Sequence, residues 1–314
     1  MGYSYIAAGI SIINDIVYED GKAIDGILGG CGIFAVSGIA QFTDDVILVT
    51  SGGPDFFDYY GRYLEENGLS EEGVYITMPH THHTLLAYEE DGGRWAERSI
   101  FGDDYFALQN GNNRTTFEKL APFLSEETKG LYLDSNAFEG IFGEIRKIRE
   151  RSPRIKIMWE PTTMSRTDPD QHDSVLKGIG LCDAFSMNLN EAKAFFGTQD
   201  YDSTVECLKR IAKPCFLRLG TDGSAWIEDG TVTRCLAYIF EEGVDPTGCG
   251  NTSTAVSLWR WREGYAPAGI VCAANAAAAL CSLQRGPAAV RDIGEYPDRK
   301  EISRELLGAV HTDC

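Results

Sequence analysis

Short apolar runs rich in β-branched and aromatic residues alternate along this chain with segments of helical pattern. Strands that are apolar throughout are buried on both faces, and a helix between consecutive strands makes a parallel connection. The alternation therefore predicts a parallel sheet covered by helices on both sides. The expected strands are residues 4–13, 46–50, 130–134, 156–159, 184–188 and 215–219. The expected helices are residues 55–67, 138–151, 190–197, 203–212, 249–263 and 267–284.

Two hairpin patterns interrupt this alternation. Residues 84–100 read as two strands joined by an Asp-Gly-Gly turn, and residues 16–28 read as a weaker hairpin around an Asp-Gly pair. They predict a small β-lid, formed by about residues 16–30 and 80–104, beside the main sheet. No linker, repeat or low-complexity tract divides the sequence, so residues 1–314 are expected to form a single α/β domain.

Charge and composition limit the partners and the location. The formal net charge is −19, from 28 basic and 47 acidic residues, which excludes nucleic acid as a partner but not a small phosphorylated molecule. No membrane partner is expected, because no run of about 18 apolar residues is present. Nine scattered cysteines and an N-terminus without signal-peptide features predict a cytoplasmic location. A two-stranded lid needs support, so a homodimer through the β-lid, with Trp95 in contact, is also expected.

The segment VDPTGCGNT, residues 244–252, precedes a good helical pattern. Gly248 and Gly250 let the backbone adopt positive φ and approach a ligand closely. A turn of this kind aims several free N–H groups and the positive end of the helix dipole at one point. It therefore predicts an anion hole suited to a phosphoryl group in transfer. The alternative is a plain glycine-rich loop that caps the helix.

The same segment resembles the signature D-T-x-G-A-G-D of the PfkB, or ribokinase-like, kinases. The matching positions are Asp245, Thr247, Gly248 and Gly250, with Cys249 in place of the usual Ala. Asn251 stands where the family carries the aspartate that takes the proton from the substrate hydroxyl. The P-loop motif of other kinases is absent from the sequence.

This resemblance implies a ribokinase-like three-layer α/β/α sandwich with a mainly parallel central sheet and a small β-lid. It implies ATP-dependent phosphotransfer to a hydroxyl of a small sugar, nucleoside or polyol. Asn251, Gly248, Gly250 and Asp245 would form the catalytic loop, and Thr247 and Cys249 would contact the nucleotide.

Two further matches concern the substrate side. Asp15 follows the first expected strand, where the family places an aspartate that binds sugar hydroxyls, although it could instead cap a turn. Gly29 and Gly30 open a helix and resemble the family's Gly-Gly motif, whose backbone lines the sugar pocket. Asn136, after another expected strand, would line the same pocket.

The remaining matches concern the nucleotide side. Asn188 and Glu191 resemble the N-x-x-E motif, whose Glu organises Mg²⁺ and its waters near the phosphates; they would also suit a helix N-cap and its capping-box acid. Gly220 and Gly223 resemble the family's L-G-x-x-G loop, and Asn275 lies on an alanine-rich helix like the one that borders adenine. The resemblance therefore implies ATP and Mg²⁺ as cofactors.

Asn251 departs from the family pattern, because an amide has essentially no basicity near neutral pH. General-base catalysis contributes roughly 10²–10⁴-fold, whereas phosphoryl transfer depends mainly on positioning and electrostatics. Three interpretations stay open: an active kinase whose base is absent or replaced by Asp245 through a water, a pseudokinase that binds sugar and nucleotide, or a likeness of fold alone. The retained Glu191 and glycines favour the first. If the base is absent, Asn251→Asp should raise kcat by ~10²–10⁴-fold, and if Asp245 replaces it, the added carboxylate should be neutral or harmful.

Overall fold

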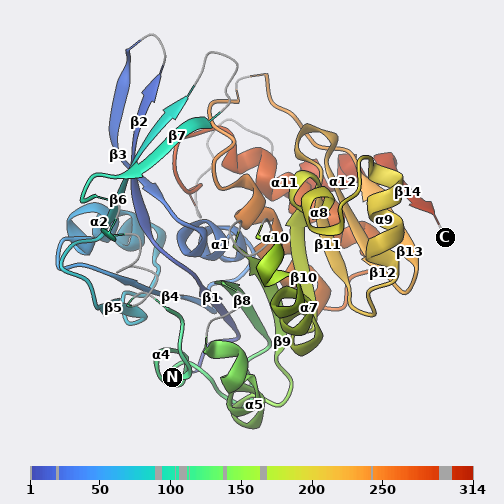
Figure 1. The fold of residues 1–314 in the computed structure, drawn as a ribbon, viewed down its shortest axis with the longest axis horizontal. Helices are drawn as coiled ribbons and strands as arrows, with labels where there is room; N and C mark the ends of the chain where they lie inside the picture. Colours follow the sequence, from blue (N-terminus) through green and yellow to red (C-terminus); the bar gives the residue numbers. More distant parts are fainter. Residues whose placement is uncertain are drawn as a thin grey trace.

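The computed structural model describes residues 2–18, 21–88, 94–102, 104–105, 112, 114–136, 140–162, 168–241, 243–289 and 299–313. Across these ranges, a 10-stranded sheet has the order β14-β13-β12-β11-β10-β9-β8-β1-β4-β5 (Figure 1). Its strands are β1 (Tyr5–Ala8), β4 (Val46–Gly52), β5 (Val74–Ile76), β8 (Gly130–Ser135), β9 (Lys156–Pro161), β10 (Ala184–Asn188), β11 (Cys215–Arg218), β12 (Ser224–Glu228), β13 (Thr231–Cys235) and β14 (Val310–Asp313). Pairing is parallel from β5 to β11 and antiparallel from β11 to β14.

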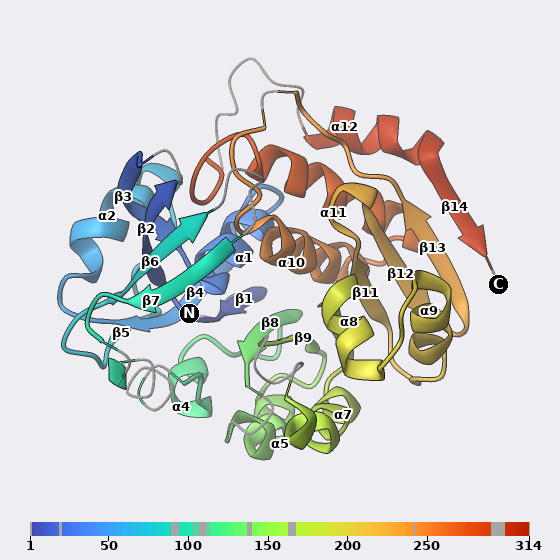
Figure 2. The same cartoon turned by 45° about the horizontal axis from the view of Figure 1, so that its top comes forward.

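Helices cover both faces of this sheet, as Figure 2 shows. On one face lie α1 (Cys31–Ala40), α2 (Phe56–Asn67), α10 (Cys249–Arg262), α11 (Pro267–Cys281) and α12 (Arg299–Leu306). On the other lie α4 (Phe117–Leu120), α5 (Ile141–Arg151), α7 (His172–Leu181), α8 (Leu189–Phe196) and α9 (Tyr201–Lys209). Successive strand side chains point to opposite faces, so neighbours such as Leu131 and Tyr132 enter two different cores. The three-layer α/β/α sandwich expected from the sequence is confirmed.

One expected strand, residues 4–13, is wrong as a single element. β1 ends at Ala8, and β2 (Ile12–Tyr18) belongs to a second sheet. Between them the backbone passes close to α1, since a Cβ on Gly9 would lie 2.9 Å from the Gly32 nitrogen. Ser11 is anchored here by a 2.9 Å hydrogen bond with Thr50. The apolar pattern continues through this change of sheet because both strands are buried, and so it gives no sign of the break.

The second sheet has four strands, in the order β3-β2-β6-β7, within the part of the chain that the structure describes. It contains β2, β3 (Ala23–Gly29), β6 (His82–Tyr88) and β7 (Arg94–Ser99), which stand together beside the main sheet in Figure 1. Parallel pairing of β2 with β6 joins the two hairpins. The strands come from both segments assigned to a lid, and closure over a ligand stays a prediction. The Asp-Gly-Gly turn and the Trp95 side chain lie outside the described residues.

The order in which strands are added to the sheet reverses between β1 and β8, which themselves pair in parallel. From β1 the chain continues to β4 and β5 on one side, whereas β8 to β11 follow on the other. At such a switch point the connections leave in opposite directions, which opens a crevice at the carboxyl ends of the strands. This edge is where a ligand is expected. None of the helices in the described ranges has the length and apolarity needed to cross a bilayer.

Candidate active site

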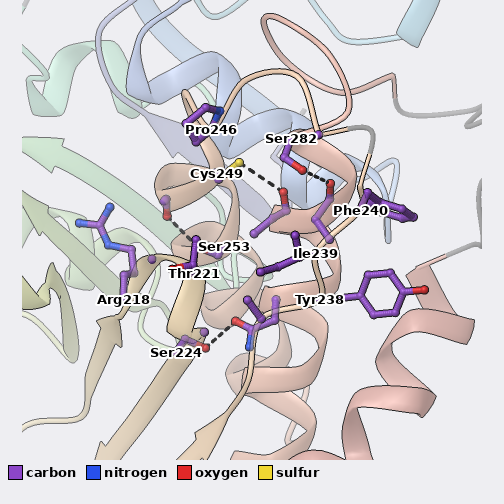
Figure 3. A pocket seen from close by; sticks show the side chains of 18 of the residues that line it. Arg218, Thr221, Ser224, Tyr238, Ile239, Phe240, Pro246, Cys249, Ser253 and Ser282 are labelled. Carbon is purple, nitrogen blue, oxygen red and sulfur yellow. Dashed lines mark hydrogen bonds between the residues drawn. The ribbon is translucent and has the colours of Figure 1, made fainter. Parts of the chain in front are cut away.

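A cavity of about 530 Å³ lies at the carboxyl edge of the sheet, beside β10 and β11 (Figure 3). Its walls come from the loop after β11, the segment after β13, the turn before α10, and α11. Its volume suits a small-molecule ligand. The cavity brings together many of the residues predicted from the sequence: Asn188, Gly220, Gly223, Asp245, Cys249, Gly250 and Asn275.

The predicted glycine turn feeds the N-terminus of α10. Gly248 is the N-cap, with a left-handed φ of 81°, and a Cβ on it would lie 2.1 Å from the Phe34 ring. Asp245 stabilises the turn by accepting a 2.9 Å hydrogen bond from the Thr247 N–H through Oδ1. Because the first N–H groups of a helix have no intrahelical acceptor, this end of α10 presents donors to a ligand in the cavity.

Asn275 and Cys249 hold the cavity wall in place. The Asn275 amide donates to the carbonyl oxygens of Cys235 and Leu236, at 3.0 and 2.8 Å, and accepts from the Ser224 hydroxyl at 2.7 Å. It therefore positions the segment after β13. Cys249 Sγ donates to a carbonyl oxygen of α11 at 3.3 Å, and its hydrogen bond with Cys281 raises the pKa of its thiol.

Asn188 and Glu191 form the capping box of α8. Asn188 Oδ1 accepts from the Glu191 N–H at 2.9 Å, and Glu191 Oε2 accepts from the Asn188 N–H at 2.8 Å. Within the described ranges, no group of three or more His, Cys, Asp and Glu side chains could hold a metal. Mg²⁺ usually binds one or two carboxylates plus substrate phosphates and waters. Glu191, buried beside the cavity-lining Asn188, fits a role of this kind.

Asn251 belongs to a buried polar cluster that the signature motif at residues 245–251 did not predict. Its Nδ2 donates to Glu160 Oε1 at 3.2 Å and to the Tyr132 hydroxyl at 3.3 Å. The Tyr132 hydroxyl donates to Glu160 Oε2 at 2.8 Å, and Arg218 Nη2 lies 2.8 Å from Glu160 Oε1. Glu160 is only 3% exposed. Side chains from β8, β9, β11 and α10 thus meet beneath the first turn of α10.

Arg218 links this cluster to the cavity. Burial alone would lower the pKa of Arg218, but the carboxylates of Glu160 and Glu191 raise it, so the guanidinium stays charged. The Arg218–Glu191 distance is 3.5 Å. A Cβ on Gly250 would lie 2.3 Å from Arg218 Nη1, so the guanidinium lies against the first turn of α10. Burial, and then the Glu160 charge, raise the pKa of Tyr132, which stays a hydrogen-bond donor.

The sequence carried one signal for this cluster. Glu160 and Arg218 each stand at the carboxyl end of an apolar strand, in the segments KIMWE and CFLRL. Charged groups are almost never buried without a partner of opposite charge. An acid and a base at equivalent strand ends therefore indicated a buried pair, although the pattern alone could not show that Asn251 joins it.

The predicted substrate residues divide between two places. Asp15 lies within the second sheet, where its Oδ1 accepts from the Gly26 N–H at 2.8 Å and lies 2.9 Å from His83 Nε2. Asn14, its neighbour on the strand, points to the other face and packs closely against Gly29, where a Cβ would lie 2.2 Å from Asn14 Nδ2. The structure thus brings Asn14, and not Asp15, to the Gly-Gly turn.

Gly30, Asn136 and Cys31 complete this side of the crevice. Gly30 is the N-cap of α1, with φ of 90°. Asn136, which follows β8, is hydrogen-bonded to the Thr162 hydroxyl. Cys31, the first residue of α1, has a thiol pKa raised by burial and by its hydrogen bond to Asp134. The N-terminus of α1 therefore faces the carboxyl ends of β8 and β9.

Solved structures of kinases share this fold. A fructokinase from Vibrio cholerae O395, bound to fructose, ADP and calcium, has a TM-score of 0.73 and 15% identity, covering 96% of this chain and 98% of that one. Ribokinase from Arabidopsis thaliana, complexed with ribose and ATP, has a TM-score of 0.70 and 19% identity, covering 98% and 99%. Adenosine kinase from Sinorhizobium meliloti has a TM-score of 0.70 and 18% identity, covering 92% and 98%. The fold is ribokinase-like α/β.

The sequence profile described as pfkB family carbohydrate kinase matches residues 15–292. The chain therefore belongs to the pfkB family. An uncharacterised protein of Schizosaccharomyces pombe is 23% identical over 236 residues, which are 71% of this chain and 61% of that protein. The chain thus spans less than two-thirds of the length of this curated relative.

Proposed function

We propose that the protein transfers the γ-phosphoryl group of ATP to a hydroxyl of a small sugar, nucleoside or polyol. The observation that carries this proposal is the convergence of the α10 N-terminus with Arg218 at the cavity, around Gly248 and Gly250. Free N–H groups, a helix dipole and a guanidinium together suit a phosphoryl group. A bond forms from the acceptor oxygen to phosphorus, the bond from phosphorus to the leaving ADP oxygen breaks, and the hydroxyl proton passes to a phosphoryl oxygen or to water.

The nucleotide would occupy the cavity. Its base would lie between α11 and the segment that Asn275 positions, and its phosphates would extend past Gly220 towards Gly250. Mg²⁺ would be held mainly by the phosphates, with Glu191 and Asn188 nearby, and would neutralise charge during transfer. The ligands of two structural neighbours, ADP in the fructokinase and ATP in the ribokinase, support this assignment.

The acceptor would lie between the second sheet and the N-terminus of α1, near Gly29, Gly30 and Asn136. Asn14 would contact it, because its side chain packs against Gly29. Asp15 would serve the acceptor indirectly, by holding β2 to β3 through the Gly26 N–H. The sheet of β2, β3, β6 and β7 would act as a lid, and closure would exclude water from the transfer.

A pseudokinase is the second candidate, and Asn251 is the observation that favours it. The Asn251 amide cannot accept the proton of the substrate hydroxyl. Asp245, the other candidate base, already accepts a hydrogen bond from the Thr247 N–H through one carboxylate oxygen. Both candidates bind nucleotide, and only the kinase transfers phosphate. Turnover with a panel of sugars, nucleosides and polyols separates them.

Nucleotide binding tests both candidates together. Mg-ATP at about 100 times its Kd should raise the free energy of unfolding by about 2.7 kcal/mol, measured by denaturation with and without ligand. Gly250→Ala should weaken binding, because its Cβ would displace the Arg218 guanidinium. Gly143→Ala on α5 is the matched control, since nothing lies within 4 Å of its added Cβ. Failure of millimolar ATP, ADP and GTP to bind would refute both candidates.

A further inference from the structure

The orientation of the Asn251 amide is fixed by its partners. Its Nδ2 carries two hydrogens, and its two acceptors, Glu160 Oε1 and the Tyr132 hydroxyl, lie towards the sheet at 3.2 and 3.3 Å. The oxygen and nitrogen of an amide point in different directions from the same carbon. Asn251 Oδ1 is therefore turned away from the Glu160 carboxylate.

An aspartate would not fit this environment as it stands. A carboxylate at position 251 would place an oxygen about as close to Glu160 Oε1 as the Asn251 nitrogen is now, at 3.2 Å. Two carboxylates at that distance cannot both ionise without a large cost. The Tyr132 hydroxyl cannot relieve the repulsion, because its hydrogen is donated to Glu160 Oε2. An amide fits because its NH₂ group supplies the two donors that this position needs.

We propose that Glu160 is a positioning residue for the phosphotransfer reaction and that it forms a matched carboxylate–amide pair with Asn251. Glu160 holds the amide so that Asn251 Oδ1 accepts a hydrogen bond from the acceptor hydroxyl and aligns that hydroxyl with the phosphoryl group. The negative charge of the site is carried by residue 160 and not by residue 251. This inference rests on the proposed function, since it assigns a role in that reaction.

The groups around Glu160 support this assignment of charge. Arg218 from β11 pairs with Oε1, and Tyr132 from β8 donates to Oε2. Two further titratable groups near this cluster are the Cys31 thiol from α1 and the Asp134 carboxylate from β8. Burial, then Asp134, and to a smaller extent the Glu160 charge raise the pKa of the Cys31 thiol, so the thiol stays neutral. Arg218 thus lies between two carboxylates, Glu160 at 2.8 Å and Glu191 at 3.5 Å, and a third carboxylate at position 251 would have no cation of its own.

A cycle of variants tests the pair by kinetics. Glu160→Gln and Asn251→Asp should each lower kcat by about 10²-fold, the cost of a misplaced reacting group, with a smaller change in KM. The double variant Glu160→Gln/Asn251→Asp restores one carboxylate and one amide, so its kcat should return to the wild-type value or above it. Glu263→Gln, at the opposite end of α10, removes a carboxylate outside the cluster and should leave kcat unchanged.

The stability of the same variants tests the pair without turnover. In Asn251→Asp, repulsion raises the folded-state pKa of one carboxyl above its unfolded-state value of about 4. A raised carboxyl pKa removes stability as the pH rises above the unfolded-state value, so the variant should approach the wild-type midpoint of thermal unfolding at about pH 4 and fall below it at about pH 8. The double variant should lose this pH dependence.

The possible results distinguish a failure of the proposed Glu160–Asn251 pair from a failure of the proposed function. Suppose that the wild type transfers phosphate. If Glu160→Gln then has the wild-type kcat, or if the double variant is no faster than the single variants, the positioning role of Glu160 is wrong and the proposed function stands. An Asn251→Asp variant with wild-type stability at both pH values would also overturn the pair. A wild type that binds no nucleotide would refute the proposed function, and the role of Glu160 in it, whatever the stability cycle shows.

Discussion

Gly248 is the position of the turn before α10 where a side chain is least tolerated. Its left-handed φ of 81° is strained for an L-residue by about 1–2 kcal/mol, and its Cβ would lie 2.1 Å from the Phe34 ring. Overpacking of this kind costs about 1–3 kcal/mol more. We therefore expect Gly248→Ala to lower the free energy of unfolding by about 2–5 kcal/mol in urea titrations.

Gly264→Ala is the matched control for this prediction. Gly264 has φ of 80°, and nothing lies within 4 Å of its added Cβ, so only the backbone strain applies. The difference between the two variants measures the contact with Phe34. Equal losses would mean that the Phe34 ring moves aside without cost.

At the scale of single residues, the sequence predicted the backbone of the site better than its buried charges. Gly248, Gly250 and the capping box of Asn188 with Glu191 were found because each motif is local and its residues act on neighbouring N–H groups. Asn251, Glu160 and Tyr132 lie far apart in the sequence and meet only through the order of β8 and β9 in the sheet. That order follows from tertiary packing, which no local pattern encodes.

Among the elements, α10 is fixed to the sheet at its C-terminal end by Glu263. This carboxylate accepts from Lys129 Nζ at 2.8 Å and from the Tyr5 hydroxyl at 2.6 Å, and these hydrogen bonds lower the pKa of Glu263. A lowered carboxyl pKa contributes stability above its unfolded-state value of about 4.3, and this contribution is lost as the pH falls through the folded-state pKa.

Glu263→Gln should therefore destabilise the protein at pH 7 and have little effect at about pH 2, where the carboxyl is protonated in both states. The loss should not exceed about 1 kcal/mol, because the side chain is partly exposed to solvent. Urea titrations at the two pH values measure it. Glu66→Gln, which removes an exposed pair with Arg62, should change little at either pH. A loss that is equal at both pH values would show that packing, and not charge, is involved.

The sheet of β2, β3, β6 and β7 should respond to ligand as a unit. If it closes as a lid, a sugar-type acceptor should slow hydrogen exchange of its amides more than that of β8 and β9, because lids are low-stability elements. Mass spectrometry of peptides from each strand measures this. Protection that is the same with and without ligand would identify the sheet as a static surface, as in a homodimer formed through it.

The elements that the sequence did not predict have physical reasons. Residues 224–235 form the β12–β13 hairpin around Asp229 and Gly230, an Asp-Gly turn that is itself a hairpin signal. The expected alternation of parallel strands and helices does not include it, because β12 and β13 extend the sheet from β11 by antiparallel pairing without a helix between them. β14, the short edge strand at residues 310–313, is mostly exposed and has no apolar alternation to detect.

For the whole molecule, the fold class was predictable because alternating strands and helices admit few arrangements. The pairing of β2 with β6 was not predictable, since it joins two hairpins about 70 residues apart, and loop closure over such a length leaves no local trace. The second sheet therefore depends on the main domain for its register. Its hairpins alone should be only marginally stable.

The pairing of Asn251 with Glu160 also limits how the protein can change over time. Replacing Asn251 by aspartate alone sets two carboxylates 3.2 Å apart, and replacing Glu160 by glutamine alone leaves Arg218 without its nearest counter-ion. Return to the family's usual loop therefore requires two substitutions, and either one made first passes through a weakened intermediate. If the two residues form the proposed pair, we expect homologous sequences that descend from this protein to keep Asn251 and Glu160 together or to lose both.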